Sequence, residues 1–272
     1  MLMAANNTVL NYRMFGRPIG GENGVIVFLH GWGRTLDDFN DLKNHLTQAL
    51  PQAPTPKSLV SGQAVFLALD LPGFGGSPLA KADGFSLDDY CITLRAFFEK
   101  LELGHVVLIG HSLGGRIAIK FAARHPERVE KLVLISAAGI PYRSLRTFLL
   151  GLGRRLFQTV FYAFGDLKSI VRFRNLFGAI FGSKDYQISH GALRDTLKKV
   201  LAEDLRPDAA KIKVPTLLLW GARDQITPLR DGQEYHTLIR GSRLEVLDSG
   251  HFVFLEHPEE CARRIASFLQ NR

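Results

Sequence analysis

The sequence predicts an α/β protein with a mostly parallel, doubly wound sheet and a helical insertion. Short apolar runs rich in β-branched residues alternate with helical patterns along most of the chain. These runs are apolar along their whole length, which is typical of parallel strands covered by helices on both faces. The alternation stops between residues 140 and 208, in a segment rich in Phe and Arg. We interpret that segment as the insertion.

The first predicted strand is 25–29, a continuous apolar run of sequence VIVFL. The helix after it is expected to start at Thr35, which can cap the first turn, with Asp38 three residues further on. The apolar face of this helix contains Phe39, Leu42 and Leu46.

The next strand and helix are separated from the first pair by an irregular connection. Residues 51–63 contain three prolines and are expected to lie at the surface. A buried strand is predicted at 64–69. Ser86 and Asp89 have the spacing of a capping box, which predicts a helix over 86–101.

The remaining elements continue the alternation. A strand at 105–109 leads through Ser112 into a helix that includes 116–123, which Pro126 stops. Further strands are predicted at 132–135, 216–220 and 244–247, and further helices at 229–239 and 258–269.

These elements divide the chain into a core in two parts and a cap. The first part of the core is predicted at residues 1–139, the helical cap at 140–208 and the second part of the core at 209–272. Ligands of such sheets bind beyond the carboxyl ends of the strands, and we expect the cap to lie over those ends. Segment 147–164 is not expected to span a membrane, because Arg154 and Arg155 lie at its middle.

The composition is that of an ordinary globular protein. Of the 272 residues, 46% are hydrophobic and 22% are charged, which favours neither disorder nor a fibrous protein. Cys91 and Cys261 are far apart and are expected to be buried free thiols. The first residues contain no basic cluster followed by an apolar run, so we expect a cytoplasmic protein.

The net charge of +8 is concentrated in the predicted cap. Between Arg143 and Arg174 there are seven lysines and arginines against one aspartate, Asp166. This basic segment could be a solvated face, could bind an acidic protein, or could make peripheral contact with an anionic membrane. Nucleic acid is not an expected partner, because no recognition motif accompanies the charge.

The sequence GHSLG at 110–114 predicts a catalytic nucleophile. It fits G-x-S-x-G, and the strand before it and the helix after it supply the context that this motif requires. The flanking glycines avoid clashes at a strained turn, and the helix N-terminus favours developing negative charge on Ser112. The competing interpretation is a glycine-rich turn that binds phosphate without catalysis.

A base and an acid for Ser112 are expected later in the chain. Asp224 and His251 each follow a predicted strand, and the order Ser112, Asp224, His251 is the one this type of sheet predicts. Asp248 and Asp70 are the alternatives for the acid, although both are typical turn residues. His190 has no partner that we can name. The other histidines besides His251 are expected to be structural, solvated or capping: His30, His45, His105, His111, His125, His236 and His257.

Two backbone N–H groups are candidates for an oxyanion hole. The N–H of Leu113 follows the serine, and the N–H of Trp32 lies in the loop after the first predicted strand. The Trp32 side chain could alternatively be only a pocket wall.

Together these motifs make the chain resemble the α/β-hydrolase superfamily. The resemblance is carried by HGWG at 30–33, DLPGFG at 70–75, GHSLGG at 110–115, HPER at 125–128, GARD at 221–224 and GH at 250–251. It covers nearly all of the chain outside 51–63 and the insertion. Within the superfamily, the first three motifs are similar to those of the methyl ester esterases that act on pimeloyl-carrier protein. Such an esterase would dock an acidic carrier protein on a basic cap.

The hypothesis is therefore a serine hydrolase of small-molecule carboxylic esters, with the apolar cap residues binding an acyl chain. The resemblance also implies alternatives, namely carbon–carbon bond hydrolysis or a lyase on the same residues, or a ligand-binding module without catalysis. Carbon–carbon bond hydrolases of this superfamily usually carry Asn where His111 stands. No metal or cofactor is expected, because the sequence has no Cys/His cluster.

Overall fold

A computed structural model describes residues 1–15, 24–50, 64–141 and 189–270 of the 272-residue chain. One eight-stranded sheet runs through this part, in the order β1-β2-β4-β3-β5-β6-β7-β8. Neighbouring strands from β4 to β8 are parallel, whereas β1 and β2 are antiparallel to their neighbours. The strands are β1 (Leu2–Ala5), β2 (Thr8–Phe15), β3 (Val25–Leu29), β4 (Val65–Leu69), β5 (Val106–His111), β6 (Val129–Ile135), β7 (Thr216–Gly221) and β8 (Arg243–Leu247).

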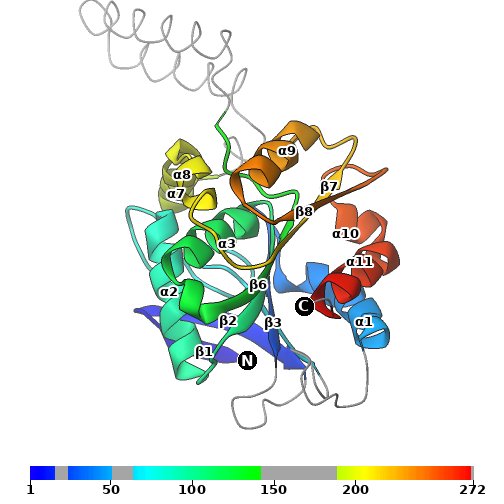
Figure 1. Cartoon of the computed structure of the whole chain (residues 1–272). Helices are drawn as coiled ribbons and strands as arrows, with labels where there is room; N and C mark the ends of the chain where they lie inside the picture. Colours follow the sequence, from blue (N-terminus) through cyan, green and yellow to red (C-terminus); the bar gives the residue numbers. More distant parts are fainter. Residues whose placement is uncertain (16–23, 51–63, 142–188, 271–272) are drawn as a thin grey trace, which may run out of the picture.

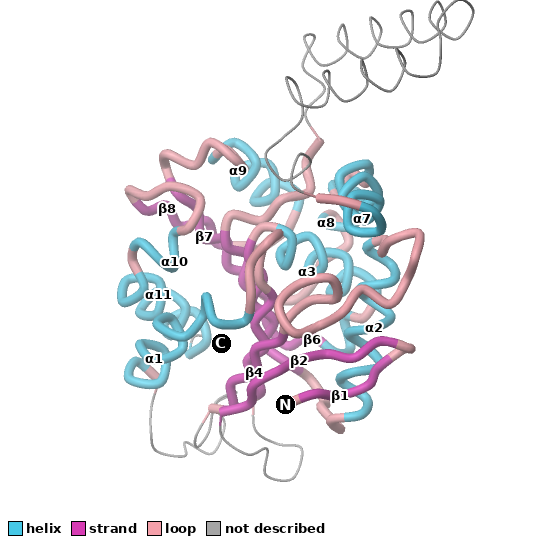
Figure 2. Tube along the Cα trace, turned by 180° about the vertical axis from the view of Figure 1, so that it is seen from behind, coloured by secondary structure: helices cyan, strands magenta, loops and turns pink. Residues whose placement is uncertain are grey.

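Helices cover both faces of this sheet, which confirms the predicted fold class (Figure 1). On one face lie α1 (Asn40–Ala49), α10 (Val253–Glu256) and α11 (Pro258–Gln270). On the other lie α2 (Leu87–Lys100), α3 (Leu113–Arg124), α7 (Gly191–Ala202) and α8 (Arg206–Ala209), and the view from behind shows the same two groups (Figure 2). Helix α9 (Leu229–Leu238) packs with the second group through Tyr235.

The central strands are apolar throughout because both of their faces are buried. In β3, Val25, Val27 and Leu29 point into the cluster beneath α2 and α3. Ile26 and Phe28, which alternate with them, point into the cluster beneath α1 and α11. Helices on both sides therefore exclude water from the whole strand.

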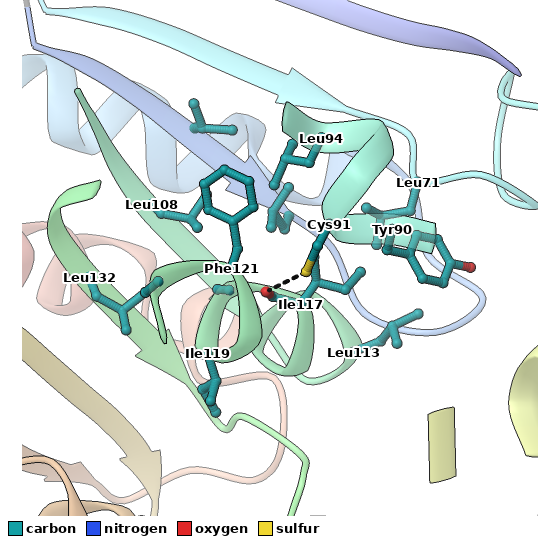
Figure 3. Close-up of a cluster of buried hydrophobic side chains, with 14 of the residues drawn as sticks. Leu71, Tyr90, Cys91, Leu94, Leu108, Leu113, Ile117, Ile119, Phe121 and Leu132 are labelled. Atoms are coloured by element: carbon teal, nitrogen blue, oxygen red, sulfur yellow. Dashed lines mark hydrogen bonds between the residues drawn. The ribbon is translucent and has the colours of Figure 1, made fainter. Parts of the chain in front are cut away.

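The cluster on the α2 and α3 face supports the helix that follows Ser112. Figure 3 shows Phe121 and Ile117 of α3 lying between Leu108 of β5 and the α2 side chains. The Cys91 thiol of α2 lies 3.9 Å from the carbonyl oxygen of Ile117. Both cysteines are free and buried, as expected.

Strands β1 and β2 were not predicted from the sequence. In β2 the side chains alternate between buried and less buried positions, with Thr8, Leu10 and Tyr12 on the buried side. A search for continuous apolar runs misses such a strand, whereas a search for a period of two residues would find it.

The predicted helix starts differ in how well they agree with the structure. At Ser86 the capping box is present, with both reciprocal hydrogen bonds between Ser86 and Asp89. At Thr35 the chain first forms a 3₁₀ turn, η1 (Leu36–Phe39), and Thr35 caps through the N–H of Asp37. Asp38 forms no capping box there, because its carboxylate pairs with Arg34.

Most of the predicted cap, residues 142–188, lies outside the described residues, and so does the basic segment 143–174. The end of the predicted cap is described, and it packs on the core. Leu197, Val200 and Leu205 of this part join the same apolar cluster as α2 and α3. The boundaries at 139 and 209 stay predictions. No helix in the described ranges is long and apolar enough to cross a membrane.

Candidate active site

Ser112 occupies a sharp turn between β5 and α3. Its backbone has φ 52° and ψ −108°, a conformation that costs an L-residue energy and persists only where its surroundings impose it. The glycines around it leave no room for a side chain. A Cβ on Gly110 would lie 2.5 Å from the carbonyl oxygen of Gly114, and one on Gly114 would lie 2.0 Å from that of Leu29. The turn therefore requires glycine at both positions.

Backbone hydrogen bonds fix the Ser112 peptide on both sides. Its N–H donates to the carbonyl of Ile135 at 3.2 Å. Its carbonyl accepts from the N–H of Arg116 at 3.1 Å and from that of Ala138 at 3.2 Å. The hydroxyl-bearing residue is partly exposed and lines a cavity.

Asp224 and His251 are brought together from the ends of two neighbouring strands. Asp224 follows β7 and His251 follows β8, and the two strands pair in parallel. His251 Nδ1 lies 2.8 Å from Asp224 Oδ2, and both side chains are almost completely buried. Because the carboxylate can only accept here, Nδ1 carries a proton, and in the neutral imidazole Nε2 is then the nitrogen with the lone pair.

The surroundings of Asp224 keep it ionised. Burial alone would raise its pKa, but the hydrogen bonds from His251 and Thr227 outweigh burial and lower the pKa to about 2. Oδ1 accepts from the N–H groups of Ile226 and Thr227, each at 2.9 Å. A fixed carboxylate of this kind can orient an imidazole and stabilise its protonated form.

Thr227 belongs to this network and was not predicted from the sequence. Its hydroxyl lies 2.8 Å from Asp224 Oδ2, 3.2 Å from His251 Nδ1 and 3.1 Å from the carbonyl of Ser136. A threonine three residues after an acid is common in ordinary turns, so its position gave no distinct signal. Thr227 also lines the cavity that Ser112 lines, which connects the serine to the Asp224–His251 pair.

No hydrogen bond joins the Ser112 hydroxyl to His251 within the described part of the chain. His111, the residue before Ser112, contacts His251, and the two ring centroids lie 4.7 Å apart. His111 Nε2–H donates to the carbonyl of His251 at 3.1 Å, which ties the His251 loop to the Ser112 turn. Burial, with His251 close by, lowers the pKa of His111 to about 3, so His111 is neutral. Its structural role is the one expected.

The two predicted oxyanion donors lie beside the serine. Trp32 and Leu113 both line the cavity, and no group in the described ranges accepts a hydrogen bond from either backbone N–H. A Cβ on Gly31 would lie 3.4 Å from Ser112 Cβ, so the loop that carries Trp32 closely approaches the serine. The Trp32 ring also packs edge-on against Phe74, 4.9 Å between centroids.

The alternative acids are placed elsewhere. Asp70 is buried, and its carboxylate accepts from the N–H groups of Leu36 and Gly76 and from the Asn11 amide, each at 2.8 Å. It therefore joins three segments of backbone. The side chain of Asp248 is 81% exposed and pairs with Arg223 at 2.7 Å, so it does not reach His251.

The cavity beside Ser112 has a volume of about 370 Å³. One wall is apolar and contains Leu197, Val200 and Leu201 of α7. Arg116, Thr227 and Asp231 add polar groups. The other lining residues are Trp32, Ser112, Leu113, Ala138, Gly139, Ile140, Pro141 and Ile226. Within the described residues, no three His, Cys, Asp or Glu side chains gather as metal ligands.

Comparison with known proteins places this site in a family. Residues 24–258 match the family described as the alpha/beta hydrolase fold. The chain is 29% identical to the pimeloyl-[acyl-carrier protein] methyl ester esterase of Neisseria meningitidis serogroup C, over 90% of this chain and 93% of that protein. It is 27% identical to monoacylglycerol lipase abhd6-A of Xenopus laevis, over 96% of this chain and 79% of that protein.

The fold has close counterparts among solved structures. The enol-lactonase from Burkholderia xenovorans LB400 superposes with a TM-score of 0.72 at 22% sequence identity, and the match covers 100% of both chains. At this level of identity the superposition shows a shared fold, and it carries no information on the substrate.

Proposed function

The chain belongs to the α/β-hydrolase family, and we propose that it is a serine hydrolase that cleaves carboxylic esters through an acyl-enzyme. In this proposal Ser112 is the nucleophile, His251 the general base and Asp224 the acid that orients it. The observation that carries the proposal is the strained Ser112 turn in the same cavity as Thr227, whose hydroxyl contacts both Asp224 and His251.

In the first half of the reaction, Ser112 Oγ attacks the ester carbonyl and its proton passes to His251 Nε2. The imidazolium is stabilised by ionised Asp224, which accepts from Nδ1–H at 2.8 Å. The proton then passes to the leaving alcohol as the carbon–oxygen bond breaks. The serine-to-imidazole hydrogen bond forms when substrate is bound, because such bonds are often long in an empty site.

The N–H groups of Trp32 and Leu113 hold the negative oxygen of the tetrahedral intermediate. The absence of other acceptors for them in the described ranges supports this role. Removing one such donor from a comparable site costs about a hundredfold or more in kcat. In the second half, water attacks the acyl-enzyme, with His251 taking and returning the proton in the same way.

An apolar acyl chain is the substrate feature that the cavity favours. The α7 wall presents Leu197, Val200 and Leu201 beside the serine, and apolar walls bind alkyl groups by removing their surface from water. The esterase and lipase relatives support ester hydrolysis. The cytoplasmic location, and a carrier protein or anionic membrane as partner of the basic cap, stay predictions.

The test is hydrolysis of p-nitrophenyl esters from acetate to palmitate by the wild-type chain and by Ser112→Ala. Among these uncharged esters we expect a medium or long acyl optimum, and in the variant a loss of at least about a thousandfold in kcat. Ser249→Ala is a matched control, because Ser249 is buried near His251 but has no role in the reaction. Equal turnover by wild type and Ser112→Ala would refute the proposal. No turnover of any ester would favour carbon–carbon bond hydrolysis or ligand binding instead.

A further inference from the structure

The cavity beside Ser112 contains a buried positive charge that the proposed mechanism does not use. Arg116 lies one turn of α3 beyond the serine and is only 5% exposed, yet its side chain lines the cavity. A buried arginine normally pairs with a carboxylate, because an uncompensated charge away from water costs several kcal/mol. The hydrogen-bond partners of Arg116 therefore decide whether its guanidinium can bind a ligand.

The partners of Arg116 in the described ranges are backbone carbonyls only. Nη1 donates to the carbonyl of Val200 and, at 3.2 Å, to that of Glu203, at the end of α7. No carboxylate of the described residues lies within ion-pairing distance of the guanidinium. Of the three guanidinium nitrogens of Arg116, only Nη1 donates a hydrogen bond to a described residue. Nε and Nη2 therefore have no hydrogen-bond partner among the described residues, and they can donate to a ligand in the cavity.

The acids nearest to Arg116 are engaged by other cations. Glu203 pairs with Lys120, the next basic residue along α3. Asp204 pairs with Arg206 at 2.6 Å. Asp231 lines the same cavity, and burial together with Glu234 raises its pKa to about 7, so it opposes an anion less than an ordinary carboxylate near neutral pH. The single charge of Arg116 matches a monoanion better than a doubly charged group.

We propose that Arg116 is a specificity-determining residue that binds a carboxylate on the substrate while the ester carbonyl is held at Ser112. The planar guanidinium offers parallel N–H donors to a carboxylate. Ser112 directly precedes α3 and Arg116 lies in the first turn of that helix, and both residues line the cavity. The carboxylate is therefore expected a few carbon atoms from the ester, as in the monoester of a short dicarboxylic acid. This inference rests on the proposed ester hydrolysis.

The experiment compares charged and neutral esters of the same shape. The charged series is the p-nitrophenyl monoesters of succinic, glutaric and adipic acid. In the neutral series an isopropyl group replaces each carboxylate. We expect kcat/KM of the wild type to favour one charged ester over its neutral counterpart by about tenfold or more, and Arg116→Gln to lose this preference. Because Arg116 also holds the end of α7, the readout is the ratio of kcat/KM for the charged ester to kcat/KM for the neutral ester, which a uniform change in activity does not alter.

Lys120→Gln is the matched control, because Lys120 also links α3 to Glu203 but does not line the cavity. We expect it to keep the preference for the charged ester. If Arg116→Gln is shown by circular dichroism to be unfolded, Arg116→Lys replaces it, with a reduced preference expected because the planar fork is lost. A wild type without the preference, or an Arg116 variant that retains it in full, would overturn the inference.

A binding measurement separates this inference from the proposed function. Calorimetry with monomethyl glutarate, which is charged, and dimethyl glutarate, which is neutral, needs no turnover. If no p-nitrophenyl ester is hydrolysed, the proposed function fails, but tighter binding of the charged compound to wild type than to Arg116→Gln would still support the carboxylate site. Equal binding of the two compounds by wild type would refute it.

Discussion

The turn around Ser112 is held by backbone contacts, whereas the position of His251 also depends on side chains. At Ser112, glycines allow the chain to pass within contact distance of Leu29, and peptide groups supply the hydrogen bonds. At His251, the fixed position comes from Asp224, from His111 and from Glu256, whose carboxylate accepts from the N–H of Gly250. The proposed nucleophile is thus held by the backbone, and the proposed base is held in part by side chains that can be replaced.

Gly114→Ala tests whether backbone contacts hold the Ser112 turn, and we expect it to have the largest effect on stability. The new Cβ would lie 2.0 Å from the carbonyl oxygen of Leu29, and a backbone oxygen in a central strand cannot move aside. We expect a loss of about 4 kcal/mol or more in the free energy of unfolding, measured by urea denaturation. Gly104→Ala is the control, because nothing lies within 4 Å of its Cβ. Near-normal stability of Gly114→Ala would contradict the backbone account.

The second substitution, Asp224→Asn, should remove activity and leave the fold intact. An amide cannot stabilise the imidazolium and can bind the wrong tautomer of His251, so we expect kcat to fall about ten-thousandfold. Asp248→Asn, at the exposed rival acid, should keep normal kcat. A stopped assay with a p-nitrophenyl ester measures both. Equal losses in the two variants would show that Asp224 has no special role.

The low pKa of Asp224 predicts a pH dependence of stability. Its folded pKa is about 2, below its ordinary value of 3.8, so as the pH falls the unfolded chain takes up the proton first. The stabilisation is present above pH ~4 and is lost as the pH falls toward 2, with a total of about 2 kcal/mol. Urea denaturation gives the free energies of unfolding of wild type and Asp224→Asn. We expect the difference between these two free energies to become smaller as the pH falls across this range. A constant difference would contradict the assignment.

The smallest effect is expected at Thr227. Thr227→Val keeps the shape but removes the hydroxyl that contacts Asp224 Oδ2 at 2.8 Å. A hydrogen bond to a charged group contributes about 1.5 kcal/mol, so we expect kcat to fall about tenfold. Thr227→Ser retains the hydroxyl and should keep most of the activity. If Thr227→Val and Thr227→Ser have the same kcat, the hydroxyl does not position Asp224.

The sequence was sufficient for the parts of the molecule whose signal is local. The apolar runs within β3 to β7 each show which residues form a buried strand, and GHSLGG shows a strained turn by its own composition. Ser86 and Asp89 likewise specify a helix start through contacts three residues apart. In each case the residues that form the structure are neighbours in the chain.

What could not be predicted depends on contacts between distant residues. Arg116 lies in a helical pattern, where arginine is an ordinary surface residue, and only the packing of α7 on α3 makes it buried. Thr227 gains its role from His251, which is distant in sequence. Asp38 was expected to help begin a helix, but Arg34 competes for its carboxylate. The burial of a side chain, and the competition between partners for one carboxylate, leave no pattern in the local sequence.

The pairing of β6 with β7 has a consequence for the synthesis and folding of the protein. Ile135 lies beside Leu219 in the sheet, although the whole predicted cap separates them in the chain. Ser112 is therefore synthesised well before Asp224 and His251, and chains fold from the N-terminus as they emerge from the ribosome. In the proposed mechanism, Ser112 would stay without its base until β7 and β8 have docked. We therefore expect a chain truncated before β7 to be inert toward esters.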